Sequence, residues 1–266
     1  STKVCERGEG IKLNDDRLRM LEYFSATKKY DLKVYEISED NINTLSDILP
    51  PLFLKCYASK KKISKASKNG VARREVIASY IPDKPNIMSG EFGEILSFHI
   101  MKDEYSKLNP YAPLKWRYKE AKNSPSPKTD FILICHDVNN DLVVAAECKT
   151  KATPRTKNPI EEAINGMRKD MLTRLTSTLI WLRDKAIQAG KTEKIKILNK
   201  LLDPVTYGGF EKEFKAIAII DKDLFTEPLH TEDDISDLKF NFELIAIVVP
   251  QLKKNYKTIF EKMLEC

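Results

Sequence analysis

The sequence predicts an α/β protein built as a three-layer sandwich, in which helices cover both faces of a mixed β-sheet. Short apolar runs rich in valine, isoleucine and alanine predict four buried strands, at 129–135, 142–149, 215–220 and 244–249. Segments with helical periodicity lie beside them, at 89–103, 159–189, 192–202 and 252–264. Because the third strand follows helices, as a parallel crossover strand does, the sheet is expected to mix parallel and antiparallel pairs.

An additional α+β region is predicted at the N-terminus, ahead of the segment that carries these strands. The proline-bounded stretch 81–85 is expected to be a linker, which divides the chain into an N-terminal region at 1–85 and a core at 86–266. The elements predicted within the N-terminal region are a half-exposed strand at 31–37 and a helix at 38–49 that Pro50 and Pro51 break.

Composition excludes several classes of function. With 42% hydrophobic and 32% charged residues, the chain resembles soluble globular proteins, and it has no apolar run of about 18 residues that could span a membrane. The polar N-terminus lacks the apolar segment of a secretory signal, and the five cysteines are not spaced as disulfide pairs, so a reducing cytoplasm is expected. The sequence has no glycine-rich phosphate-binding loop, which argues against ATP hydrolysis.

Two of the predicted strands carry charged residues where buried strands rarely have them. Glu147 and Lys149 are two residues apart, so they point to the same face of their strand. Asp130 opens the preceding strand, and the polar cluster 136–141 between the two strands is typical of a hairpin turn. In an antiparallel hairpin, Asp130 lies opposite Glu147, or opposite Lys149 in a slightly different register, and within roughly 5–8 Å of Glu147 in either case.

Two carboxylates and an ammonium at one end of a buried sheet suit the metal-assisted hydrolysis of a phosphodiester. Asp130 and Glu147 would leave Mg²⁺ or Mn²⁺ with open positions for water and phosphate oxygens. Lys149 would stabilise the attacking hydroxide or the charge that develops at phosphorus. The alternative is a structural ion pair at the end of a strand, which the predicted position of Asp130 makes less attractive.

Asp130 followed, after a hairpin, by Glu147-x-Lys149 resembles the PD-(D/E)xK signature of nucleases with the restriction-endonuclease-like fold, with Thr129 in place of the proline. The resemblance implies a third carboxylate on the helix that precedes the hairpin. Glu91 and Glu94 share one face of that helix. We predict that Glu94 is the third metal ligand, with Glu91 as the open alternative.

The Gly-Glu-x-Gly-Glu helix start at 90–94, the strand entered by Asp130, the Glu147-Cys148-Lys149 strand and the long helix after it more narrowly resemble the HamA family. The resemblance covers residues from about 89 to the C-terminus. It implies a nuclease subunit of the Hachiman anti-phage defence system. It also implies a helicase partner, HamB, that restrains or delivers the nuclease.

Basic residues point to a nucleic acid as the substrate. Lys151, Arg155 and Lys157 follow directly after the Glu-x-Lys triplet, where a nuclease needs cations to hold the phosphate backbone. The stretch 55–74 has eight lysines and arginines and no acid, and it is either a binding arm or a solvated segment. Trp116 lies in a basic, aromatic segment that suits ordinary packing better than base stacking.

Two functions of different classes are compatible with these features. The first is a Mg²⁺-dependent deoxyribonuclease that acts with a helicase in anti-phage defence. The second is a catalytically silent adaptor whose nuclease-like core only binds DNA or the helicase. RNA is a third option as substrate, since nothing in the sequence can be tied to recognition of the 2′-hydroxyl group.

Overall fold

A six-stranded mixed sheet forms the centre of the protein, in the order β1-β2-β6-β5-β4-β3. The computed structural model describes residues 18–29, 31–125, 128–136, 141–203, 205, 209–226, 235–236, 238 and 240–266. The strands are β1 (Phe24–Lys29), β2 (Leu32–Ile37), β3 (Phe131–His136), β4 (Asp141–Lys151), β5 (Glu211–Asp221) and β6 (Asn241–Val249). The outer pairs β1–β2 and β3–β4 are antiparallel, and the three inner pairs are parallel. The predicted mixed sheet is therefore confirmed.

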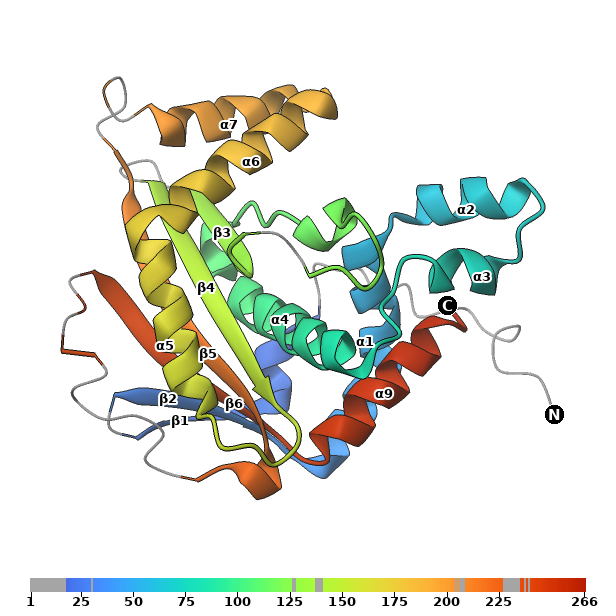
Figure 1. Ribbon diagram of the computed structural model, residues 1–266, viewed down its shortest axis with the longest axis horizontal. Helices are drawn as coiled ribbons and strands as arrows, with labels where there is room; N and C mark the ends of the chain where they lie inside the picture. The colour runs from blue at the N-terminus through green and yellow to red at the C-terminus, as the bar shows by residue number, and fades with distance from the viewer. Residues whose placement is uncertain are drawn as a thin grey trace.

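Helices cover both faces of this sheet, as predicted (Figure 1). They are α1 (Glu39–Tyr57), α2 (Lys60–Lys68), α3 (Arg73–Ala78), α4 (Pro85–Glu104), α5 (Pro159–Lys169), α6 (Leu175–Gln188), α7 (Thr192–Leu202) and α9 (Leu252–Met263). One hydrophobic cluster joins the sheet to α1, α4 and α9, and a second joins its other face to α5, α6 and α7. No helix in the described part of the chain is long and apolar enough to cross a membrane.

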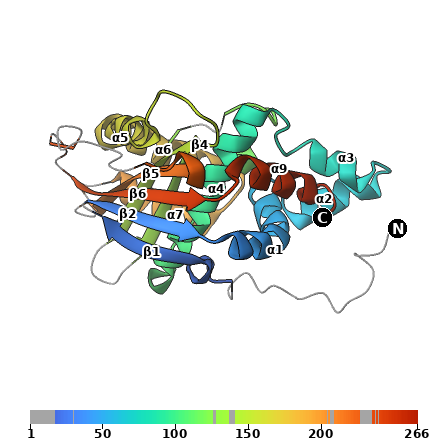
Figure 2. The same cartoon turned by 90° about the horizontal axis from the view of Figure 1, so that it is seen from below.

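The N-terminal region shares its sheet with the predicted core. β2 pairs in parallel with β6, with Val34 opposite Ala246, and β1 forms the outer edge beyond it (Figure 2). Phe53 of α1 packs against Phe92 of α4, with ring centroids 5.6 Å apart. The strand predicted as half-exposed is mostly buried, because Tyr35 and Ile37 on one face and Val34 on the other belong to the two hydrophobic clusters. The predicted division after residue 85 lies at the start of α4 (Pro85–Glu104), and the β2–β6 pairing joins the two sides of it.

Three prolines that were predicted to break or precede helices lie inside helix α1 or at the start of α4. α1 continues through Pro50 and Pro51, where a break was predicted, and the buried residues on both sides of the pair pack into the first hydrophobic cluster. Tertiary packing thus overrides the local cost of proline. α4 begins at Pro85 rather than at Ser89, because proline is well suited to the first helical position, where its missing N–H is not needed.

Candidate active site

The β3–β4 hairpin aligns the predicted acids. Phe131 lies opposite Ala146 and His136 lies opposite Asp141, so the same register places Asp130 opposite Glu147, the first of the two predicted arrangements. The Asp130 side chain also closes the open end of the hairpin, because its Oδ2 accepts a hydrogen bond of 2.7 Å from the Cys148 N–H. The predicted turn residues 137–140 lie outside the described residues.

Glu147 is buried between β4 and α5, and two cations hold its carboxylate. Lys149 Nζ donates to Oε1 at 2.5 Å, and Arg174 Nη2 donates to Oε2 at 2.5 Å. Only 4% of Glu147 is exposed. Helix α5 can approach so closely because its facing residue is Gly166, where an added Cβ would lie less than 3.0 Å from Glu147 Cγ, Cδ and Oε1. Two cations around one buried carboxylate indicate a strongly charged pocket.

Arg174 belongs to a network that the sequence analysis did not find. It lies at the end of η4 (Asp170–Arg174), a π-helical segment between α5 and α6. Its guanidinium donates to both carboxylate oxygens of Asp170, at 2.6 and 2.9 Å, and to the Gly166 carbonyl at 2.8 Å. Asp170 in turn accepts from the Thr129 hydroxyl at 2.7 Å, so Thr129, directly before Asp130, anchors this network. The sequence feature that could have indicated this network is the spacing of Asp170 and Arg174, because residues four apart can form an ion pair on one helix face.

Glu94 faces Asp130 across a buried lysine. Lys115 Nζ donates to the Thr129 carbonyl at 2.8 Å and lies 3.7 Å from Glu94 Oε2 and 3.8 Å from Asp130 Oδ1. Trp116 Nε1 also donates to Glu94 Oε2, at 3.1 Å. Both Lys115 and Trp116 come from η3 (Lys115–Tyr118), and sequence reasoning had assigned neither of them to the site. Trp116 is 2% exposed, which confirms the prediction that it packs internally.

Glu91 has different partners from Glu94, although both lie on α4. Glu91 Oε2 accepts from the Tyr57 hydroxyl at 2.7 Å, and Oε1 forms an ion pair with Lys119. The carboxylate of Glu91 and the ammonium of Lys119 are both buried. This arrangement joins α1, α4 and the segment after η3, which is a structural role. The acid of α4 that contacts the Lys115–Asp130 group is Glu94.

The electrostatics of the cluster follow from burial and from the proximity of its acids. Burial raises the pKa of Glu94 to about 8, and the charge of Asp130 contributes in the same direction. Burial, and then Asp130, also raise the pKa of Glu147. Burial lowers the pKa of Lys149, but Asp130 and Glu147 outweigh it, so the pKa lies above its ordinary value. Glu94 and Glu147 thus each feel the charge of Asp130 in a poorly solvated space, where a cation would be stabilised.

The donor chemistry of these residues suits a hard divalent cation, because carboxylate oxygens are the ligands that Mg²⁺ takes. As they lie, however, the oxygens are engaged by Lys149, Arg174, Lys115 and the Cys148 N–H. Among the residues that the structure describes, no three His, Cys, Asp or Glu side chains form a group that could hold a metal ion. Asp130 and Glu147, which occupy opposed positions in the hairpin, are the pair that fits best.

The three predicted phosphate-binding residues lie at and beyond the end of β4. Lys151 is the last residue of the strand and is partly exposed. Arg155 and Lys157 are exposed in the loop between β4 and α5, and Arg155 Nη2 pairs with Glu162 Oε2 at 2.8 Å. The loop therefore continues from the strand that carries Glu147 and presents cations to solvent.

The fold and the site define a mixed α/β protein whose edge hairpin carries a buried cluster of acids and lysines. A model of the HamA family matches residues 14–263, which is nearly the whole chain. The chain therefore belongs to the HamA family and is a Hachiman defence protein, as the resemblance of its motifs predicted. The match extends well into the N-terminal region, which that resemblance had not covered. No curated protein matches the chain.

Proposed function

We propose that this protein is a metal-dependent deoxyribonuclease that hydrolyses DNA phosphodiester bonds and acts with a helicase subunit in anti-phage defence. The observation that carries the proposal is the geometry of the hairpin. Asp130 and Glu147 occupy opposed positions, and the Lys149 ammonium lies 2.5 Å from the Glu147 carboxylate. Membership of the HamA family supports the defence context and the search for a helicase partner.

In this proposal Asp130 and Glu147 hold Mg²⁺ or Mn²⁺, and Glu94 is the third carboxylate. A divalent ion, when bound, polarises a phosphodiester and lowers the pKa of water. The raised pKa values of Glu94 and Glu147 support this assignment, since a cation would relieve the repulsion that each acid feels from Asp130. A cation would also compete with Lys149 and Arg174 for the oxygens of Glu147.

Lys149 has a different role because its pKa lies above the ordinary value for lysine. It stays protonated at neutral pH, so it donates hydrogen bonds and does not act as a general base. In the hydrolysis, a water molecule gives up one proton as its oxygen bonds to phosphorus, the bond from phosphorus to one ester oxygen breaks, and that oxygen takes up a proton in exchange. Lys149 stabilises the negative charge that the phosphoryl oxygens gain during this exchange.

Lys151, Arg155 and Lys157 are proposed to hold the DNA backbone beside this centre. Lys157 and Arg155 are exposed to solvent, where phosphates can reach them. Arg155 would exchange Glu162 for a phosphate, which costs little because both side chains of the ion pair are partly solvated. These contacts position DNA without reading its sequence.

One observation favours a second function, that of a catalytically silent adaptor which binds DNA or the helicase. Lys149 and Arg174 already satisfy both oxygens of Glu147 without any metal ion. An adaptor that kept the nuclease architecture for binding alone would have such a neutralised carboxylate.

Plasmid cleavage separates the two functions. Supercoiled DNA is incubated with the wild type, Glu147→Ala or Lys149→Ala, in Mg²⁺ or in EDTA, with and without the helicase and ATP. The matched controls are Glu261→Ala and Lys257→Ala, which remove exposed charges from α9. A nuclease cuts only with Mg²⁺, loses activity in both site variants and keeps it in both controls. DNA binding without cutting under every condition supports the adaptor. A parallel RNA substrate tests the third option.

A further inference from the structure

A cavity lies beside α4, and none of Glu94, Asp130, Glu147 and Lys149 is among the described residues that line it. It has a volume of about 520 Å³ and lies between α1, α4 and the segment that follows α4. Pockets for small organic ligands commonly measure roughly 300–1,000 Å³. The volume is therefore large enough for a small molecule, and the predicted chemistry of the hairpin does not use it.

The charge of this cavity is strongly positive. Four cationic side chains line it: Arg19, Lys55, Lys102 and Arg117. The acid among its described lining residues is Asp103, whose Oδ2 accepts a hydrogen bond of 3.0 Å from the Leu21 N–H. One carboxylate therefore faces four cations, so the cavity favours an anion.

Arg117 is held in place at the cavity by the protein backbone. Its Nε and Nη2 both donate to the Lys55 carbonyl, at 3.0 and 2.5 Å. A guanidinium has five N–H donors, more than one carbonyl accepts, and its planar shape matches two oxygens of a phosphate. Arg117, Lys102 and Arg19 are also exposed to solvent, so a ligand can reach them.

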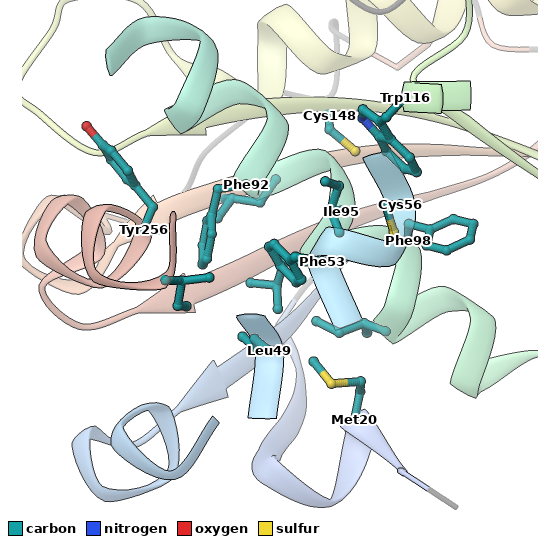
Figure 3. Packing of buried hydrophobic residues seen from close by; sticks show 14 of the residues in the cluster. Met20, Leu49, Phe53, Cys56, Phe92, Ile95, Phe98, Trp116, Cys148 and Tyr256 are labelled. Atoms are coloured by element: carbon teal, nitrogen blue, oxygen red, sulfur yellow. The ribbon is translucent and has the colours of Figure 1, made fainter. Parts of the chain in front are cut away.

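The inner wall of the cavity is apolar and partly aromatic. Phe98 lies there beside Cys56, in the same hydrophobic cluster as Trp116 (Figure 3). The rings of Phe98 and Trp116 meet edge to face, with centroids 5.5 Å apart, and both are buried, so they form a fixed support behind the cavity wall. Leu52 and Leu114 extend this apolar lining. A cavity with cations at its opening and an apolar floor suits a ligand that joins a phosphate to a flat organic ring.

We propose that this cavity is a binding site for a nucleotide. The phosphate lies at Arg117 and Lys102, and the base lies against the apolar wall that the partly exposed Leu52 and Leu114 form, with the buried Phe98 behind them. This assignment does not depend on the proposed nuclease activity, because no residue of the hairpin takes part in it. A hollow of this size favours a small molecule over duplex DNA, which would need a longer surface.

Isothermal calorimetry of the full chain tests the assignment. Adenosine monophosphate, uridine monophosphate and inorganic phosphate are titrated separately, all in EDTA, so that a metal ion at the hairpin makes no contribution. The variants are Lys102→Gln and Arg117→Gln, with Lys257→Gln as the control because it removes an exposed charge from α9. Arg117→Gln removes the hydrogen bonds to the Lys55 carbonyl and could disturb the local fold. Lys102→Gln then tests the binding site separately from these contacts.

Saturable binding of either nucleotide is expected, with affinity about tenfold weaker in each cavity variant and unchanged in the control. Inorganic phosphate is expected to bind more weakly than the nucleotides, since it makes no contact with the apolar wall. Equal affinity for phosphate and nucleotide would overturn the nucleotide assignment in favour of a simple anion site. The absence of saturable binding would also overturn the assignment. So would binding of a short DNA duplex, titrated in the same way, that depends on Lys102 while neither nucleotide binds. Loss of plasmid cleavage in Glu147→Ala bears on none of these results.

Discussion

Replacing Gly166 with alanine would disturb the candidate site from the helix that packs against it. The new Cβ would lie less than 3.0 Å from Glu147 Cγ, Cδ and Oε1, whereas ordinary van der Waals contact begins at 3.4 Å. Lys149 and Arg174 hold the carboxylate, so it cannot swing away without losing an ion pair. We expect the Glu147 carboxylate to be displaced by about 1 Å. A misplacement of that size in a catalytic group lowers the rate of the reaction by about 10²-fold.

The stability of the Gly166→Ala variant is expected to change much less than its activity. Alanine favours a helix over glycine by about 1 kcal/mol, which offsets part of the cost of about 1–3 kcal/mol for overpacking. Gly90→Ala in α4 is the matched control, because a Cβ there has no atom within 4 Å. The assays are Mg²⁺-dependent plasmid cleavage and urea unfolding. A Gly166→Ala protein that cleaves at the wild-type rate would refute the argument that the position of Glu147 controls catalysis.

Three further predictions follow from the same contacts. Arg174→Ala leaves the buried Asp170 carboxylate without its cation, so urea denaturation should show a loss of about 3 kcal/mol, and an unchanged stability would contradict this role. The pKa of Glu94 is raised from 4.5 to about 8, so the contribution of this group to the stability of the protein is fully present below about pH 4.5 and is lost as pH rises through about 8. Glu94→Gln should therefore flatten the dependence of stability on pH over this window, measured in EDTA. An unaltered dependence would count against the assignment. Gly93→Ala places a Cβ less than 3.0 Å from Thr150 Oγ1 and 3.1 Å from Ile219 Cδ1, so thermal unfolding should show a loss of about 1–3 kcal/mol. An unchanged unfolding temperature would contradict the close packing of α4 on the sheet.

The hairpin could be predicted from the sequence because alternation along a strand leaves little freedom. Once 131–135 and 142–148 are both strands, the buried faces fix which residues share a side, and a slip of one residue would turn Glu147 toward the other face. Alternation thus fixes the face that Asp130 and Glu147 share, but it leaves open whether Asp130 lies opposite Glu147 or Lys149, because a shift of two residues keeps every side chain on its face. The strands β5 and β6 were predicted for a similar reason, since their apolar runs are buried on both faces.

Other parts of the structure left no such pattern. β1 has five exposed residues out of six, so it lacks the apolar alternation of a strand and forms through its pairing with β2. Lys115 and Arg174 reach the acids from η3 and η4, short segments whose positions depend on tertiary packing rather than on sequence spacing. The role of Gly166 could not be predicted from the neighbouring sequence either, because this glycine allows α5 to approach Glu147, a contact between distant parts of the chain.

A crystal soaked in Mn²⁺ and measured for anomalous scattering tests the central claim most directly. We predict one strong peak between Asp130 and Glu147, with carboxylate oxygens at about 2.0–2.2 Å, and with Arg174 or Lys149 displaced from Glu147. A saturating soak that leaves Lys149 and Arg174 on Glu147, with no peak at Asp130, would contradict the claim that this hairpin is a metal-dependent catalytic centre.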